Sequence, residues 1–131
     1  MTINVTLDIP REVLEGVFIT AIEGGSNYWY FISEEAYKII TDAVPIDPMK
    51  SFSERMFEAV YDKGVTVPVH DVEDPDGEPI GELSKSTMQE RLQKCAEQQL
   101  WAIQEEIDER GDSTSSDVIF QYLALNGCVY G

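Results

Sequence analysis

The chain has 131 residues, of which 43% are hydrophobic, and it carries 25 acidic side chains against nine basic ones, a formal net charge of −16. This length forms about one domain with a single core. The excess of acid excludes direct, non-specific binding to nucleic acid or to an anionic membrane, because both need a basic surface. An acidic surface favours a cationic partner instead, although acidity can also serve solubility alone.

The start of the sequence predicts a strand followed by a helix. Apolar and polar side chains alternate over residues 3–9, which is typical of a half-buried strand. Pro10 suits a first helical turn, and apolar residues then recur at helical spacing over residues 13–22. Gly24 and Gly25 follow and predict the end of this helix.

A brief strand and two short helices are expected next. Residues 28–32 predict the strand, and Ser33 suits the N-cap of a helix that ends before Pro45. A second strand at residues 37–41 is the alternative to that helix. The next helix begins with a capping-box pattern and ends near a Lys-Gly pair; its signals are Ser51, Glu54, Lys63 and Gly64.

The middle of the chain predicts a β-hairpin. Valines alternate over residues 65–69, and Pro68 within this strand places it at a sheet edge. The sequence Asp74-Pro75-Asp76-Gly77 is a turn signal that leads into a second strand at residues 80–83.

Two further helices complete the prediction. A capping-box pattern at Ser86 and Gln89 opens a long helix whose apolar stripe runs over residues 88–107. A last capping-box pattern at Thr114 and Asp117 opens a buried helix that ends at Asn126-Gly127, before an apolar tail that we expect to be packed. The sequence therefore predicts a single α+β domain over residues 1–131, with a small, mostly antiparallel sheet packed against helices.

The segment after the first helix is the main candidate for a binding site. It combines glycines, which allow close backbone approach, with small polar side chains and aromatic rings that can dock a ligand or partner. The alternative is a helix stop followed by a core strand, which explains Trp29 better and the residues Ser26, Asn27 and Tyr28 equally well. We expect Ser26, Asn27, Tyr28 and Tyr130 to contribute to one shared concavity. The full set of candidate ligand- or partner-binding residues is Gly24, Gly25, Ser26, Asn27, Tyr28, Tyr30, Gln121 and Tyr130.

The acidic run in the predicted hairpin is a second candidate surface. Its spacing does not match a calcium-binding EF-hand, because Val72 and Pro75 occupy positions that need oxygen ligands. A solvated hairpin explains the run, and imitation of a phosphate backbone toward a basic protein is the functional alternative. The residues of this acidic surface are Asp71, Glu73, Asp74, Asp76 and Glu78.

No catalytic arrangement is predicted. His70 is the only histidine, and strand alternation predicts that it faces solvent. Cys95 and Cys128 lie far apart, and we expect both to be reduced. We therefore predict no catalytic residue, no metal site and no cofactor, and an enzyme is the least favoured class of protein. The absence of a signal peptide or membrane span predicts a cytoplasmic protein, and homo-oligomerisation stays open.

The segment Ala21–Tyr30, combined with Asp117–Tyr122 and Gly127–Gly131, resembles a family of small, functionally uncharacterised proteins encoded in phages and prophages. The resemblance does not extend over residues 46–86, and the chain departs from it at residues 125–128. It implies no reaction and no catalytic residues.

The phage context that this resemblance implies favours a counter-defence role in the cytoplasm of the infected bacterium. We expect a binding protein that sequesters a small, nucleotide-like immune signal or inhibits a host defence protein. The alternative is an acidic nucleic-acid mimic that occupies a basic DNA- or RNA-binding surface.

Overall fold

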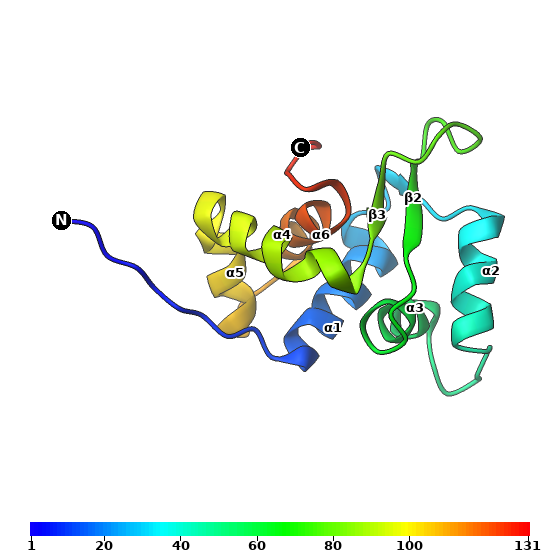
Figure 1. Ribbon diagram of the computed structural model, residues 1–131, viewed down its shortest axis with the longest axis horizontal. Helices are drawn as coiled ribbons and strands as arrows, with labels where there is room; N and C mark the ends of the chain where they lie inside the picture. The colour runs from blue at the N-terminus through cyan, green and yellow to red at the C-terminus, as the bar shows by residue number, and fades with distance from the viewer.

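Six α-helices and a three-stranded antiparallel sheet form the fold of residues 1–131 in the computed structural model (Figure 1). This is the α+β class that the sequence predicts. None of the helices is both long enough and apolar enough to cross a membrane. In chain order the elements are α1 (Arg11–Thr20), the π-helical turn η1 (Ala21–Gly25), β1 (Tyr30–Phe31), α2 (Glu34–Ala43), α3 (Phe52–Tyr61), β2 (Val67–Asp71), β3 (Gly81–Leu83), α4 (Lys85–Gln98), α5 (Leu100–Ile107) and α6 (Ser113–Leu125).

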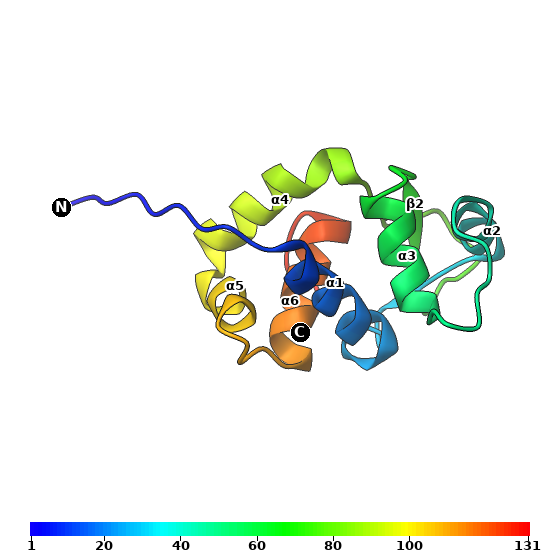
Figure 2. The same ribbon diagram turned by 90° about the horizontal axis from the view of Figure 1, so that it is seen from below.

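The last helix, α6, lies at the centre of the molecule. Every residue from Ser115 to Ala124 is buried, as expected for a helix that has no face in water. It contacts α1, α4, α5, η1 and β3. Figure 2 shows α1 in front of α6, with α5 to its left, α4 above it and α3 to its right.

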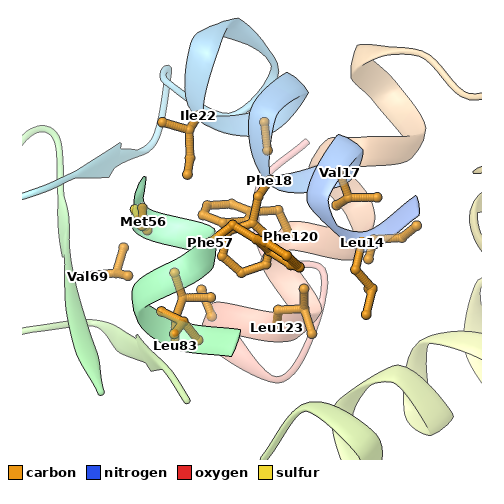
Figure 3. Close-up of a cluster of buried hydrophobic side chains, with 14 of the residues drawn as sticks. Leu14, Val17, Phe18, Ile22, Met56, Phe57, Val69, Leu83, Phe120 and Leu123 are labelled. Atoms are coloured by element: carbon orange, nitrogen blue, oxygen red, sulfur yellow. The ribbon is translucent and has the colours of Figure 1, made fainter. Parts of the chain in front are cut away.

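Three phenylalanines join α1, α3 and α6 in the core (Figure 3). Phe18 meets Phe57 and Phe120 edge to face, with ring centroids 5.1 and 5.6 Å apart. Edge-to-face pairs stabilise a core beyond their buried area. Val69 of β2 and Leu83 of β3 extend this cluster to the sheet and are fully buried.

The predicted hairpin is confirmed, and it forms most of the sheet. Val67 of β2 pairs with Leu83 of β3, while Phe31 of β1 pairs with His70 on the other side of β2. The edge position expected from Pro68 is therefore wrong, because β2 is the middle strand. Pro68 is tolerated there because β1 pairs only with the last two residues of β2.

The expected N-terminal strand is also wrong. Residues 1–9, which we call the arm, belong to no strand and make no hydrogen bond within the chain. Ile3 and Val5 are 78% and 67% exposed, and only Ile9 packs against the core. Figures 1 and 2 show the arm extending away from the body. Alternation indicates a segment that can pair, but a strand also needs a neighbouring strand.

The single long helix predicted over residues 88–107 is instead two helices. The backbone turns at Gln99, whose φ and ψ of −140° and 52° are not helical, and both α4 and α5 contact α6. The alternative strand at residues 37–41 is wrong as well, because these residues lie in α2.

Two helix starts are confirmed, and two differ from the prediction. Ser33 caps α2, and Ser51 with Glu54 forms the expected capping box of α3. However, α4 begins at Lys85, ahead of the expected cap at Ser86. Asp112, two residues before the expected Thr114, caps α6.

Candidate functional site

The loop after η1 lies against the start of α6. Gly25 makes the closest approach, because a Cβ atom there would come within 3.0 Å of the Ser113 carbonyl oxygen. The Ser26 N–H donates to the carbonyl oxygen of Ala21 at 2.8 Å and closes the helical turn. Glycine therefore lets the loop backbone reach α6, and three of the next four side chains, Ser26, Tyr28 and Trp29, contact it.

The carboxylate of Asp117 in α6 is the centre of this site. Its Oδ1 atom accepts hydrogen bonds from Ser26 Oγ at 2.7 Å and Trp29 Nε1 at 2.8 Å. Its Oδ2 atom accepts from Tyr28 OH at 2.6 Å and Gln121 Nε2 at 3.1 Å. Asp117 is only 8% exposed and has no ion-pair partner. Four neutral donors thus replace the water lost on burial, and each bond is strengthened by the charge of the acceptor.

Gln121, one turn further along α6, ties the C-terminal tail to the same network. Its Oε1 atom accepts from the backbone N–H groups of Val129 and Tyr130, both at 2.8 Å. Its Nε2 atom also donates to the carbonyl oxygen of Tyr130 at 3.1 Å. The amide therefore holds the tail in the way that a neighbouring strand would.

Aromatic contacts connect the loop, the tail and the hairpin. The rings of Trp29 and Tyr130 stack with centroids 5.4 Å apart and planes 9° from parallel. The Tyr130 hydroxyl donates to Asp71 Oδ2 at 3.4 Å, and the Val72 N–H donates to the Trp29 carbonyl oxygen at 2.9 Å. The loop, the tail and the base of the hairpin therefore form one continuous unit.

The structure brings most of the candidate binding residues together, but they bind mainly one another. Tyr30 turns inward and donates from its hydroxyl to the carbonyl oxygen of Ile22 at 2.7 Å. Gly24 and Asn27 are exposed, and the Asn27 side chain makes no hydrogen bond. Ser26 is fully buried, whereas Tyr28 is 50% exposed. Outward-facing polar and aromatic groups are therefore limited to Asn27 and Tyr28.

The phenols of the site stay protonated at neutral pH. Burial, followed by the hydrogen bond to Asp117, raises the pKa of Tyr28 to about 12. Burial alone raises the pKa of Tyr30 to about 12. Burial, followed by the charge of Asp71, raises the pKa of Tyr130. These hydroxyls serve as hydrogen-bond donors and are poorly suited to act as general bases.

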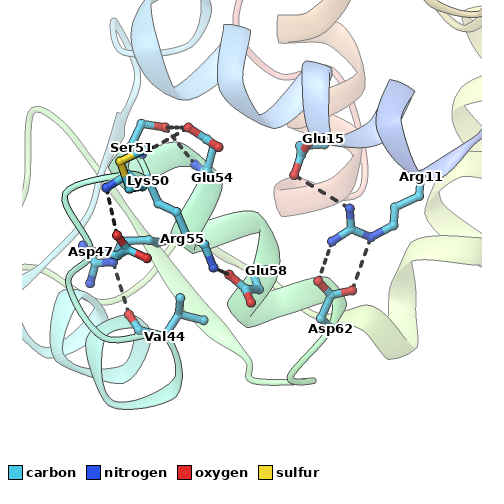
Figure 4. Close-up of polar contacts among 11 residues, drawn as sticks. Arg11, Glu15, Val44, Asp47, Lys50, Ser51, Glu54, Arg55, Glu58 and Asp62 are labelled. Atoms are coloured by element: carbon cyan, nitrogen blue, oxygen red, sulfur yellow. Dashed lines mark hydrogen bonds and ion pairs between the residues drawn. The ribbon is translucent and has the colours of Figure 1, made fainter.

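Two surface hollows lie elsewhere. The first, of about 200 Å³, is lined only by charged side chains and lies between α1 and α3, where Arg11 bridges Glu15 and Asp62 (Figure 4). The second, of about 340 Å³, lies around the loop between α2 and α3. No residue of the segment 24–30 lines either hollow.

The acidic surface at the hairpin has little positive charge to balance it. Glu73, Asp74, Asp76 and Glu78 are exposed and make no ion pair. Asp71 is half-buried, and its Oδ1 atom accepts from the Glu73 N–H at 2.8 Å. The four acids of the hairpin tip therefore face solvent as free charges.

The basic residues are mostly used within the fold. All of them except Lys38 and Lys63 make a hydrogen bond, an ion pair or a cation–π contact. Arg91 donates to the carbonyl oxygens of Leu123 and Ala124, and Arg55 is buried while donating to the Val44 carbonyl oxygen (Figure 4). Positive charge thus caps helices and covers rings, and the excess negative charge stays at the surface.

His70 does not face solvent as its alternation predicts. It is 9% exposed, and its Nδ1 atom has no hydrogen-bond partner. The reason is that β2 is covered on both faces, since α2 packs against it. Cys95 is buried and Cys128 exposed, both as free thiols. No three acidic, histidine or cysteine side chains are placed to hold a metal ion.

Asp117 is the residue that sequence reasoning assigned incorrectly, as part of a helix cap. The signal that could have identified it is its spacing from Gln121, which places two polar side chains on one side of a helix that is otherwise apolar after Ser116. Comparisons with protein-family models, with curated proteins and with solved structures found no match to this chain.

Proposed function

We propose that the chain is a non-enzymatic phage counter-defence protein that inhibits a host defence protein by binding it. The binding surface, which we call the loop–hairpin face, joins exposed loop and tail residues to the tip of the acidic hairpin. The observation that carries this proposal is the continuity of the two candidate surfaces through the Trp29–Tyr130 stack and the Tyr130–Asp71 hydrogen bond. The face comprises Asn27, Tyr28, Val72, Glu73, Asp74, Asp76, Glu78 and Val129.

The composition of this face suits a protein partner. Tyr28 and Val129 are 50% and 67% exposed, and each is held from behind by Asp117 or Gln121. Exposed tyrosines on a rigid backbone are frequent anchors of protein interfaces, because little side-chain entropy is lost on binding. The neighbouring acids select a basic partner surface and steer its approach.

A protein partner is favoured over a captured small molecule. The hydrogen-bonding groups of Ser26, Tyr28 and Gln121 are already used within the chain. A ligand site normally combines a concave apolar wall with free polar groups, whereas neither surface hollow is lined by a residue of the segment 24–30. Mimicry of nucleic acid is then one mode of action of the same face, directed at a basic surface. The site of action would be the bacterial cytoplasm.

A phage-plating assay tests the loop and the hairpin with separate variants. The bacteria carry a defence system and express the chain. Asn27→Ala removes an exposed amide of the proposed face, so it should reduce phage protection. Thermal melting should stay unchanged, because this side chain makes no hydrogen bond within the chain. The hairpin variant D74N/D76N/E78Q should reduce protection as well, because it removes three charges from the face.

The matched control is E12Q/E90Q/E97Q, which removes three exposed charges of α1 and α4 outside the face. We expect this control to protect phage as well as the parent chain does. Equal activity of all three variants with normal melts would contradict the proposed face. An equal loss in the hairpin variant and the control would reduce the proposal to a general effect of net charge.

A further inference from the structure

The arm is the one part of the chain with strand character and no partner. Ile3, Val5, Leu7 and Ile9 occupy alternate positions, and the residues between them are polar. None of the backbone N–H or C=O groups of the arm is hydrogen-bonded. Asp8 is its only charged side chain, in a chain with 25 acidic residues.

The sheet of the same chain offers this arm no good edge. The outer side of β3 is closed by α6, since a Cβ on Gly81 would lie 2.2 Å from the Ala124 carbonyl oxygen. Arg91 also donates to the Glu82 carbonyl oxygen there, at 3.0 Å. On the other side, β1 has only two residues, and Pro68 lacks the N–H that a further strand would need.

We propose that the arm pairs with the arm of a second copy, antiparallel and centred on Thr6, and that the chain forms a two-fold symmetric dimer through this ribbon. Ile3 of one copy then lies opposite Ile9 of the other, and Val5 lies opposite Leu7. All eight apolar side chains share one face of the ribbon, because side chains alternate with a period of two.

A second copy fits the arm better than an unrelated strand for two reasons. In two identical arms the alternating apolar residues lie opposite one another by symmetry, whereas an unrelated protein would need an exposed strand edge with the same alternation. The pairing also keeps the acidic bodies apart. The two Pro10 residues lie at opposite ends of the ribbon, about 26 Å from each other at about 3.3 Å per residue. This exceeds the screening length of about 8 Å at physiological salt.

The apolar face of the ribbon is supported at both ends. Ile9 packs against the core of its own body, and Leu7, at 37% exposed, is less exposed than Ile3 and Val5. The pairing brings Ile3 of the second copy beside Ile9, next to the same core. This support is important because an isolated two-stranded ribbon is only marginally stable in water.

Sedimentation of the full chain over a series of protein concentrations tests the proposal. We expect a monomer–dimer equilibrium at physiological salt. The variant I3S/V5S should weaken association about tenfold or more, because it removes apolar area that the ribbon withdraws from water. The matched control N4S/T6S changes only the opposite face and should associate within about threefold of the parent. Neither pair should alter thermal melting measured on dilute monomer, since the arm lies outside the folded body.

Cross-linking tests the register. In a Cys128→Ser background, T6C should form a disulfide dimer on mild oxidation, because facing residues of antiparallel strands have Cα atoms about 4.5 to 5.5 Å apart. T2C should not cross-link, since Thr2 lies opposite Pro10. A monomer at every concentration, a dimer unaffected by I3S/V5S, or equal losses in I3S/V5S and N4S/T6S would overturn the proposal.

Discussion

Asp117 is a buried anion stabilised only by neutral donors, which makes it sensitive to small chemical changes. In the parent chain, each carboxylate oxygen of Asp117 accepts from two donors. In Asp117→Asn, an NH2 group replaces one of these oxygens and must face two donors. We expect the free energy of unfolding to fall by about 2 to 4 kcal/mol, because hydrogen bonds to a charged group are the stronger kind and unpaired buried donors are unfavourable. Urea denaturation measures this loss.

Asp76→Asn is the control for that measurement. It makes the same chemical change at an exposed carboxylate that has no partner, and it should alter stability by no more than about 0.5 kcal/mol. Similar stabilities for the two variants would show that the Asp117 network contributes little.

The phenols of Tyr28 and Tyr30 link stability to alkaline pH. Both have a pKa raised to about 12 in the folded protein, so folding favours their protonated forms. Their contribution is complete below the ordinary pKa of about 10 and is lost as the pH rises to about 12. We therefore expect the free energy of unfolding to fall over this window.

Ultraviolet titration of phenolate absorbance checks this assignment. Tyr28→Phe and Tyr30→Phe should each remove one of the groups that ionise late. If either variant keeps the full late absorbance step, the assignment of that phenol is wrong.

At the level of elements, the start of α6 depends on Asp112. Its side chain accepts from the backbone N–H groups of Thr114 and Ser115 at 2.9 and 3.1 Å. We expect Asp112→Ala to destabilise the protein by about 1 kcal/mol, the typical loss when a helix cap is removed. Thermal melting of both variants checks this assignment. Thr114→Ala should have little effect, because this exposed residue is not the cap. Equal effects would contradict the assignment of the cap.

The sequence predicted several elements whose signals lie within a few residues, although the equally local caps expected at Ser86 and Thr114 were wrong. The cap at Ser33, the capping box at Ser51 and the turn of the hairpin depend on groups two to three positions apart, and all three occur in the structure. The break at Gln99 was not predicted, because it is fixed by how α4 and α5 pack on α6. The arm shows the converse case, in which a correct local pattern lacks the neighbour that would make it a strand.

The candidate site was predictable in part, for the same reason. Aromatic and polar residues beside two glycines identified the loop, and an apolar end identified the tail. Their common acceptor could not be inferred, because Asp117 is separated from Ser26 by 91 residues. Burial of His70 was missed because alternation predicts two faces but does not tell whether a helix covers the second one.

For the whole molecule, most of the negative charge has no ion-pair partner. Only Glu15, Glu58, Asp62 and Asp108 take part in ion pairs, against a net charge of −16. Mutual repulsion opposes the compact state and is screened by salt. We therefore expect the melting temperature to rise as sodium chloride is raised from low to physiological concentration and beyond. A fall over that range, measured by calorimetry, would indicate that specific ion pairs outweigh the repulsion.

The position of α6 also determines when the protein can fold during its synthesis. Trp29 needs a partner that lies 88 residues further along the chain, and the phenylalanine cluster waits for Phe120. At translation rates of about 5 to 20 residues per second, these side chains stay without their partners for roughly 4 to 20 seconds. We expect the excess of acidic side chains to keep the unfinished chain in solution during this interval, so the same charge that opposes the compact state would protect the nascent chain from aggregation.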